Sequence, residues 1–229
     1  VNRIVNQGEL RKQLPTDLGF GDITLDNSGL LNVRNGSLTL NQGSVAQLSA
    51  GALSGGSWLV IGDAQLSFAG AGISTVGVGT SITRIGRHAG LTALNALSRN
   101  EGTIRIYGGG TLDIAPSSGS FVNAGEFFLN NSTALVIQGS FVQTASGSLR
   151  VGIGAHNMFS TGRAISASTV ALEGSIGVTL ELGYVPRVGD RFFILEGAPV
   201  SAGTAVVIPD SGPTPELVYL PTGVLLVYV

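Results

Sequence analysis

The chain has 229 residues, of which 43% are hydrophobic and only 11% charged, and its formal net charge is -2. This length and hydrophobic content allow a sizeable core, while the low charge requires a surface covered mainly by glycine and small polar residues. A slightly acidic chain lacks the basic field that attracts nucleic acid or anionic membranes. The absence of cysteine excludes disulfides and thiolate metal sites, and no apolar run is long enough to predict membrane insertion.

A short repeated pattern begins in the N-terminal part of the chain. It consists of a glycine, a polar residue, an apolar residue, a variable residue and a second apolar residue, as in Gly36–Leu40. This alternation predicts short strands with one buried face. Similar copies follow at 102–106, 110–114, 147–151 and 174–178.

The spacing of these strands predicts a solenoid. The glycine that opens a strand recurs after 21, 23 and 22 residues, in the intervals 8–29, 102–125 and 125–147. A period in the low twenties is one coil of a repeat protein. An asparagine precedes several of these glycines by two positions, and we expect it either to stack in an internal hydrogen-bonded ladder or to serve as a turn residue. These asparagines are Asn6, Asn27, Asn100 and Asn123.

Each coil in the middle of the chain divides into three strands. The predicted strands are 103–107, 111–115 and 120–122 in one coil, and 126–129, 134–137 and 140–142 in the next. Three strands per coil predict a parallel β-helix, in which equivalent strands stack about 4.8 Å apart. The inward side chains then form apolar columns, which we assign to Ile104, Phe127 and Leu149 and to Ile106, Leu129 and Val151.

The stretch 84–99 departs from the repeat. Leucines at positions 91, 94 and 97 are spaced by three residues, which predicts a short helix or an irregular loop packed against the solenoid. His88 lies beside Arg84 and Arg87. These three side chains could form a small anion site, although a charged loop face is the favoured interpretation.

The C-terminal part is expected to close the solenoid. Residues 197–215 are rich in Pro, Gly, Ser and Thr, which predicts a loop. The apolar stretch 217–229 is interrupted by Pro221 and Gly223, which predicts a hairpin. We therefore expect one elongated domain, with a parallel β-helix over 1–196 and a loop and terminal hairpin over 197–229 as its cap.

Several segments resemble the repeat units of bacterial β-strand-repeat surface proteins. The segments are 139–151, 170–180 and 184–195, and residues 1–12 and 26–40 resemble an upstream unit. Autotransporter passengers and filamentous-haemagglutinin-like adhesins share this style. The resemblance implies a right-handed parallel β-helix that supports or displays an adhesive surface outside the cell, and it transfers no catalytic motif.

No arrangement of residues indicates catalysis or metal binding. Parallel β-helices include polysaccharide lyases and hydrolases, which need carboxylates clustered with basic residues. The densest acids, Asp17, Asp22 and Asp26, do not match a calcium loop. His88 and His156 lie far apart and form no metal motif. We predict no enzyme activity, no metal and no cofactor.

One outward column is the candidate ligand-binding site. Arg105, Phe128 and Arg150 each lie three places after a strand-opening glycine, so they should stack on successive coils. Two guanidinium groups with an aromatic ring between them suit an acidic sugar. In the alternative interpretation, Phe128 packs under a neighbouring segment and the arginines only keep a charge-poor surface soluble.

The sequence thus predicts a non-catalytic structural or adhesive segment of a secreted or cell-surface protein. Acidic glycans or other copies of a surface or matrix protein are the partners considered, with no nucleic acid. The alternatives are a carbohydrate-binding module, for which an exposed stripe of aromatic residues and arginine would be diagnostic, and a polysaccharide lyase or hydrolase. An enzyme would require at least three acidic and basic residues to converge in one groove.

Overall fold

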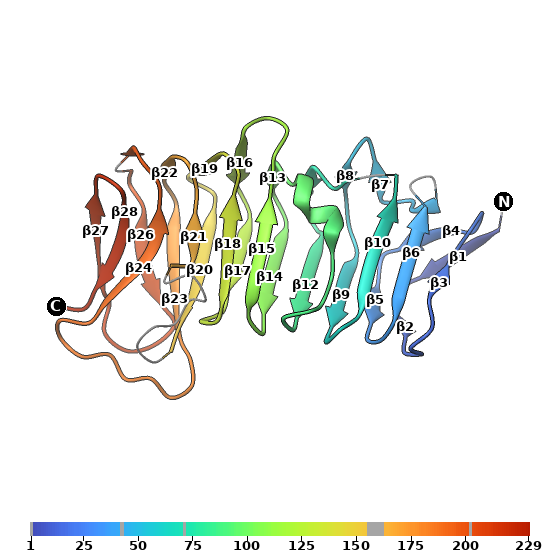
Figure 1. The fold of residues 1–229 in the computed structure, drawn as a ribbon, viewed down its shortest axis with the longest axis horizontal. Coiled ribbons are helices and arrows are strands. Elements are labelled where there is room, and N and C mark those ends of the chain that lie inside the picture. Colours follow the sequence, from blue (N-terminus) through green and yellow to red (C-terminus); the bar gives the residue numbers. More distant parts are fainter. Residues whose placement is uncertain (1, 42–43, 71, 155–162, 202) are drawn as a thin grey trace.

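The computed structural model describes residues 2–41, 44–70, 72–154, 163–201 and 203–229. The chain forms an all-β solenoid of about 7 turns, as predicted, in which parallel coils follow one another from the N-terminal to the C-terminal end (Figure 1). Each regular coil contributes one strand to each of three faces, which we number in chain order. A helix long and apolar enough to cross a membrane is not found among the described residues.

Face 1 is a continuous parallel sheet of nine strands. Neighbouring strands pair residue for residue, so equivalent positions of successive coils lie directly above one another. Its strands, in order, are β2 (Glu9–Lys12), β5 (Leu30–Val33), β9 (Ser57–Ile61), β12 (Ser81–Ile85), β14 (Thr103–Tyr107), β17 (Glu126–Leu129), β20 (Ser148–Ile153), β23 (Ser175–Leu180) and β26 (Val206–Pro209).

Face 2 is divided by the segment 86–98. Before it come β3 (Leu18–Gly19), β6 (Ser37–Asn41) and β10 (Gln65–Ala69). After it come β15 (Gly110–Ile114), β18 (Thr133–Ile137), β21 (Ile165–Ser166) and β24 (Arg191–Glu196), all parallel. Two antiparallel strands, β28 (Gly223–Val227) and β27 (Glu216–Leu220), extend this sheet at the C-terminal end.

Face 3 carries the shortest strands. At the N-terminal end β1 (Arg3–Asn6) pairs with β4 (Thr24–Asn27), and β7 (Leu48–Ser49) pairs antiparallel with the first strand of the longer sheet. The longer sheet consists of β8 (Ala52–Leu53), β11 (Thr75–Val76), β13 (Arg99–Asn100), β16 (Ser120–Asn123), β19 (Ser140–Gln143), β22 (Val170–Leu172) and β25 (Val200–Ser201). The six strands predicted in the middle of the chain agree with β14 to β19 to within one residue at each end.

The two predicted inward columns are confirmed. Ile104, Phe127 and Leu149 pair in register and are fully buried, and so are Ile106, Leu129 and Val151. Strands of four or five residues bury little area individually, so stacking supplies the stability. Fully burying one such side chain contributes roughly 1.5–3 kcal/mol, and each column repeats that contribution coil after coil.

The asparagines form two internal ladders at the corner between faces 3 and 1. Asn6 donates to Asn27 over 2.7 Å, and Asn100 donates to Asn123 over 2.8 Å. The second ladder continues to Gln143, which sequence analysis missed although the Ser-Phe-Val segment before it repeats the one before Asn123. Each ladder amide also donates to a backbone carbonyl of face 1, which satisfies a buried polar group.

The irregular stretch occupies a strand position of face 2. It contains the 3-10 helix η2 (Thr92–Ala96), so the structure has the first of the two predicted alternatives, a short helix or an irregular loop. The leucines at 91, 94 and 97 are all buried, because side chains three residues apart share one face of a 3-10 helix. Arg84, by contrast, belongs to strand β12, so the irregular stretch begins later than predicted.

The C-terminal part needs one correction. Residues 197–215, expected as a loop, include β25 and β26, which add parallel strands to faces 3 and 1. The solenoid therefore runs past the expected boundary at residue 196, because stacking on β22 and β23 orders even short extended segments rich in Pro and Gly. The hairpin predicted over 217–229 is confirmed as β27 and β28.

Candidate functional site

The predicted outward column is assembled as expected. Arg105 pairs with Phe128 across β14 and β17, and Phe128 pairs with Arg150 across β17 and β20. The next position of the column is Gly177, where an added Cβ would lie 2.6 Å from Cγ of Arg150. The stem of Arg150 therefore lies over this glycine, and the three candidate side chains do form one stack.

Both arginines of the column are paired with carboxylates. The Arg105 guanidinium lies 3.0 Å from Glu126, and that of Arg150 lies 2.6 Å from Asp210, which also accepts a hydrogen bond from Thr179. Phe128 is only 6% exposed, and the ring of Tyr107 lies 4.9 Å from its ring. An acidic sugar would have to displace both acids and would find little of the Phe128 ring face open, so glycan binding at this column stays a prediction.

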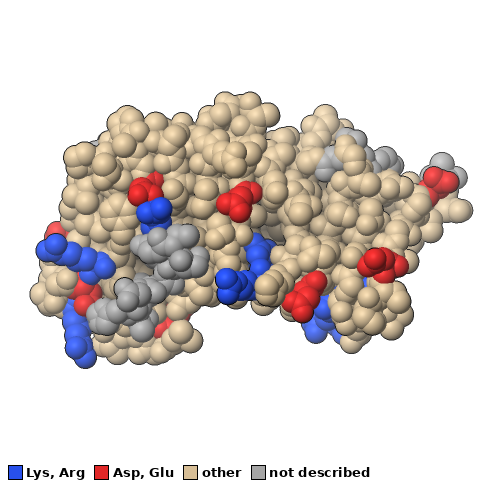
Figure 2. Space-filling model, in the orientation of Figure 1, with Lys and Arg blue, Asp and Glu red and all other residues tan. Residues whose placement is uncertain are grey.

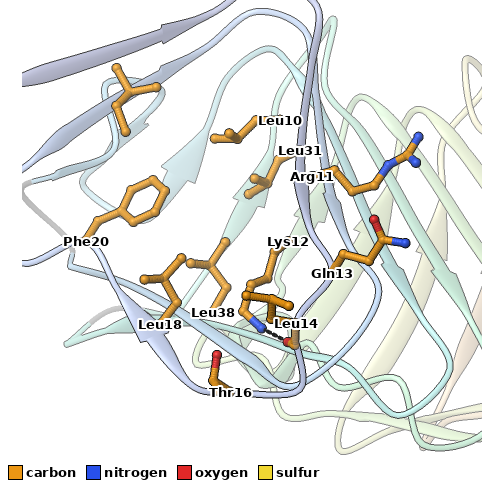
Figure 3. A pocket seen from close by; sticks show the side chains of 11 residues that line it. Leu10, Arg11, Lys12, Gln13, Leu14, Thr16, Leu18, Phe20, Leu31 and Leu38 are labelled. Atoms are coloured by element: carbon orange, nitrogen blue, oxygen red, sulfur yellow. Dashed lines mark hydrogen bonds between the residues drawn. The ribbon is translucent and has the colours of Figure 1, made fainter.

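An apolar hollow lies at the N-terminal end of the solenoid (Figure 3). It measures about 570 Å³, and Leu10, Leu18, Phe20, Leu31 and Leu38 point into it from strands of the first coils or from the residue that follows β3. Three strands border it as the outermost strands of their sheets, namely β1, β2 and β3. Their outer backbone groups are therefore available for pairing, as at any sheet edge.

Lys12 closes one side of this hollow. Lys12 points inward from β2, and it pairs with Val33, the apolar residue at the same position of the next coil. The Lys12 side chain is buried, and its ammonium donates to the backbone carbonyls of Leu14 and Asn35, the latter over 2.8 Å. Lysine can serve at the end of an apolar column because its stem packs there while its charge reaches polar atoms.

A second, polar hollow of about 460 Å³ runs along the corner between faces 3 and 1. Two carboxylates line it, Glu101 and Glu126, and a pair of carboxylates is what a glycoside hydrolase requires. Glu101 lies 2.6 Å from Arg99, and Glu126 is bound to Arg105. Each carboxylate is thus engaged by its own arginine.

The other predicted polar candidates do not assemble. Asp17 and Asp22 are exposed, whereas Asp26 accepts hydrogen bonds from Gln47 and Arg3, which together lower the pKa of Asp26. Among the described residues no three acids or histidines lie close enough to hold a metal ion. The side chain of His88 is exposed, and His156 falls outside the described residues.

Arg84 is the feature that sequence analysis placed wrongly. It was grouped with the irregular stretch, but it occupies the second inward position of β12, between Val60 and Ile106. The signal was present, because 81–84 follows the same alternation as 103–106. Arginine at an apolar position of the pattern therefore marks a buried charge.

Comparisons with known proteins give no match for this chain. No family model, no curated protein and no solved structure is similar to it. That the chain is a β-solenoid repeat protein therefore follows from the structure alone.

Proposed function

We propose that the chain is a non-catalytic structural segment of a secreted or cell-surface protein, where it forms part of a rigid β-solenoid rod. The observation that carries this proposal is the difference between the two ends of the stack. One end exposes its apolar interior and three strand edges, and the other carries an antiparallel hairpin.

The N-terminal end is suited to stack against another β-coil. Leu18 is 45% exposed and Leu14 is 69% exposed at this end, although Leu18 stands in register with the buried Leu38 of β6. In every inner coil the equivalent surface is covered by the next coil. A further coil would bury the hollow and pair the free edges of β1, β2 and β3.

At the C-terminal end, an antiparallel hairpin follows the last parallel strand of face 2. Strand β28 reverses direction and pairs antiparallel with β24, and β27 lies outside it. Val224 and Leu226 of β28 are fully buried, so the hairpin contributes to the core. A chain reversal of this kind interrupts continued parallel stacking at face 2.

Sequence resemblance gives the proposal its biological setting. The repeat units resemble those of bacterial surface proteins of the autotransporter-passenger and filamentous-haemagglutinin-like type, and this resemblance is the reason for proposing a position outside the cell. On the face that Figure 2 shows, charged side chains are few and scattered among the other described residues, and we take this as support for a display role. An adhesive role, with acidic glycans or other copies of a surface or matrix protein as partners, is the finer form of the same proposal.

Adding a coil tests the rod. A fusion that places an extra copy of residues 98–117 before the chain supplies one strand for each face and leads into β1 on face 3, so it should cover the apolar end and raise the melting temperature by about 5 °C. A fusion of equal length made of Gly and Ser is the matched control and should leave it unchanged. Equal melting temperatures for the two fusions would contradict stacking at this end.

Labelling of intact cells tests the location. An antiserum against the purified chain should label unpermeabilised cells of the source organism, and external protease should remove the signal. The same cells after permeabilisation serve as the control. Labelling that requires permeabilisation would place the protein inside the cell and overturn the proposal.

A further inference from the structure

Arg84 is a charged residue in the middle of an apolar column. Its neighbours above and below in the column, Val60 and Ile106, are fully buried, and Arg84 itself is only 7% exposed. Lys12, the other basic residue of this column, lies at its open end. Arg84 has coils on both sides, so its guanidinium cannot leave the solenoid by way of an open end.

The guanidinium of Arg84 lacks the carboxylate partner that six other arginines have. Six arginines pair with a carboxylate at no more than 3.0 Å, and all six have side chains at least 35% exposed: Arg3, Arg11, Arg99, Arg105, Arg150 and Arg163. Among the described residues no carboxylate oxygen lies within 4.0 Å of Arg84. Nη2 donates to the backbone carbonyl of Arg87 over 2.9 Å, and the buried Nε has no hydrogen-bond partner.

Such a group is costly unless something pairs with it. Burial removes water from the charged form and lowers the pKa of the Arg84 guanidinium from its ordinary value. A guanidinium has five N–H donors in a planar fork that matches an oxyanion, and here one donor has an assigned partner. The unsatisfied buried charge therefore points to an anion that binds at this position.

The turn that follows β12 adds a second cation close to Arg84. Arg87 is exposed on the turn that follows β12, and it too has no carboxylate within 4.0 Å among the described residues. Gly110 of the next coil packs against both arginines, since an added Cβ would lie 3.3 Å from Cγ of Arg87 and 3.6 Å from Nη2 of Arg84. Figure 2 shows basic side chains near the middle of the lower edge of this view, where the turns after β12 and β14 lie in Figure 1.

We propose that the turn after β12 binds a small oxyanion, a sulfate or phosphate group, between the buried guanidinium of Arg84 and the exposed guanidinium of Arg87. Arg84 supplies charge-assisted hydrogen bonds in a desolvated position, and Arg87 closes over the anion from the solvent side. The site lies at the break in face 2 and is separate from the column of Arg105, Phe128 and Arg150. It does not depend on the proposed rod function, because neither the open end nor the location of the protein enters the argument.

Equilibrium dialysis with radiolabelled sulfate, in sodium chloride of constant ionic strength, tests the site. We expect one sulfate per chain. Arg84→Met keeps an apolar stem in the column and should weaken binding at least about tenfold. Arg87→Gln changes an exposed side chain, so it should fold normally, and it should weaken binding by a smaller factor. Arg105→Gln is the matched control, because Glu126 already neutralises that arginine, and it should bind like the wild type.

Thermal unfolding gives an independent readout. Sulfate stabilises most proteins by exclusion from their surface, so the measured quantity is the extra rise in melting temperature of the wild type over Arg84→Met. We expect that extra rise to saturate with sulfate and to vanish in Arg84→Met. Without sulfate, Arg84→Met should melt at the same temperature as the wild type or above it, because it removes an unpaired buried charge.

A competition experiment identifies the source of the oxyanion. Displacement of labelled sulfate by a sulfated disaccharide would show that the site accepts such a group on a glycan, and displacement by inorganic phosphate alone would assign it to free anions. Both outcomes retain the site. Absence of sulfate binding to the wild type, or equal binding by Arg84→Met and the wild type, would overturn it.

Discussion

The stretch 99–153 and the stretch 86–98 build the same solenoid by different local structures. In 99–153 every coil supplies three strands, and equivalent residues pair in unbroken register from β14 to β20. In 86–98 a 3-10 helix stands where face 2 has a strand in most other coils. Both stretches nevertheless fill the interior with apolar side chains, and both continue the stack.

Backbone hydrogen bonds explain why the segment 86–98, which we call the break, does not end the solenoid. The amide of Ile73 in the preceding coil donates to Ala93 over 2.7 Å, and that of Ala115 in the following coil donates to Asn95 over 2.6 Å. The 3-10 segment thus offers carbonyls to both neighbours, as a strand would. The comparison teaches that a coil needs inward apolar side chains and a few stacking hydrogen bonds, and that β geometry on all three faces is not required.

The largest effect is expected from a charge in the regular stretch. Phe127→Asp places a carboxylate in the column between Ile104 and Leu149, where the wild-type side chain is fully buried and its ring contacts that of Phe121. We expect a loss of about 4 kcal/mol or more in the free energy of unfolding, because an unpaired carboxylate is buried and an aromatic contact is lost. Urea denaturation measures this loss.

Glu126→Ala is the control for that experiment. Its side chain points outward next to Phe127, and it loses only a partly exposed ion pair with Arg105. We expect a change below about 1 kcal/mol. Similar losses for both variants would mean that the inward and outward faces of β17 do not differ as described.

The regular stretch was predictable from sequence because its signal is repeated. Gly102, Gly125 and Gly147 open equivalent strands, so one register assignment fixed both columns and the outward stack. The break was only partly predictable. Its leucine spacing indicated a helix, but no periodicity showed that the helix would replace a strand of face 2 and remain inside the stack.

The candidate site was less predictable than the fold. Register brought Arg105, Phe128 and Arg150 together, yet the pairing of Arg150 with Asp210 joins residues from segments 60 positions apart. Such a contact depends on the path of the chain near β26, which composition had indicated as a loop. Burial of Arg84 followed the repeat pattern, but its basic neighbours obscured that pattern.

An intermediate effect tests whether the break belongs to the cooperative core. Leu94→Ala in η2 and Leu135→Ala in β18 both truncate a fully buried leucine on face 2. Because both positions are packed from two sides by neighbouring coils, we expect each variant to lose about 3 kcal/mol in urea denaturation.

The exposed Thr92→Ala in the same 3-10 helix is the matched control and should change stability by less than about 0.5 kcal/mol. A loss below about 1 kcal/mol for Leu94→Ala, with the full loss for Leu135→Ala, would show that the break is a peripheral insertion.

The smallest effect concerns the corner between faces 3 and 1, where the regular stretch differs in chemistry from the coils that precede it. In the regular stretch this column holds Asn100, Asn123 and Gln143, whereas the two coils between this ladder and the Asn6–Asn27 ladder place Leu53 and Val76 in it. An apolar residue is therefore acceptable at this position when its neighbours are apolar. A substitution inside the ladder differs, because it leaves polar partners behind.

Asn123→Ala removes the acceptor of Asn100 and the donor to Gln143 and to the carbonyl of Ser148. We expect a loss of about 2 kcal/mol in urea denaturation, because buried polar groups then lack partners. Asn95→Ala changes an exposed asparagine in η2, so it is the control and should be nearly neutral.

A second variant separates hydrogen bonding from volume. Asn123→Asp keeps the shape of the side chain but cannot donate to Gln143, so it should be at least as destabilised as Asn123→Ala at neutral pH. If both variants were as stable as the wild type, the ladder would contribute nothing, and the polar corner would be equivalent to the apolar one before the break.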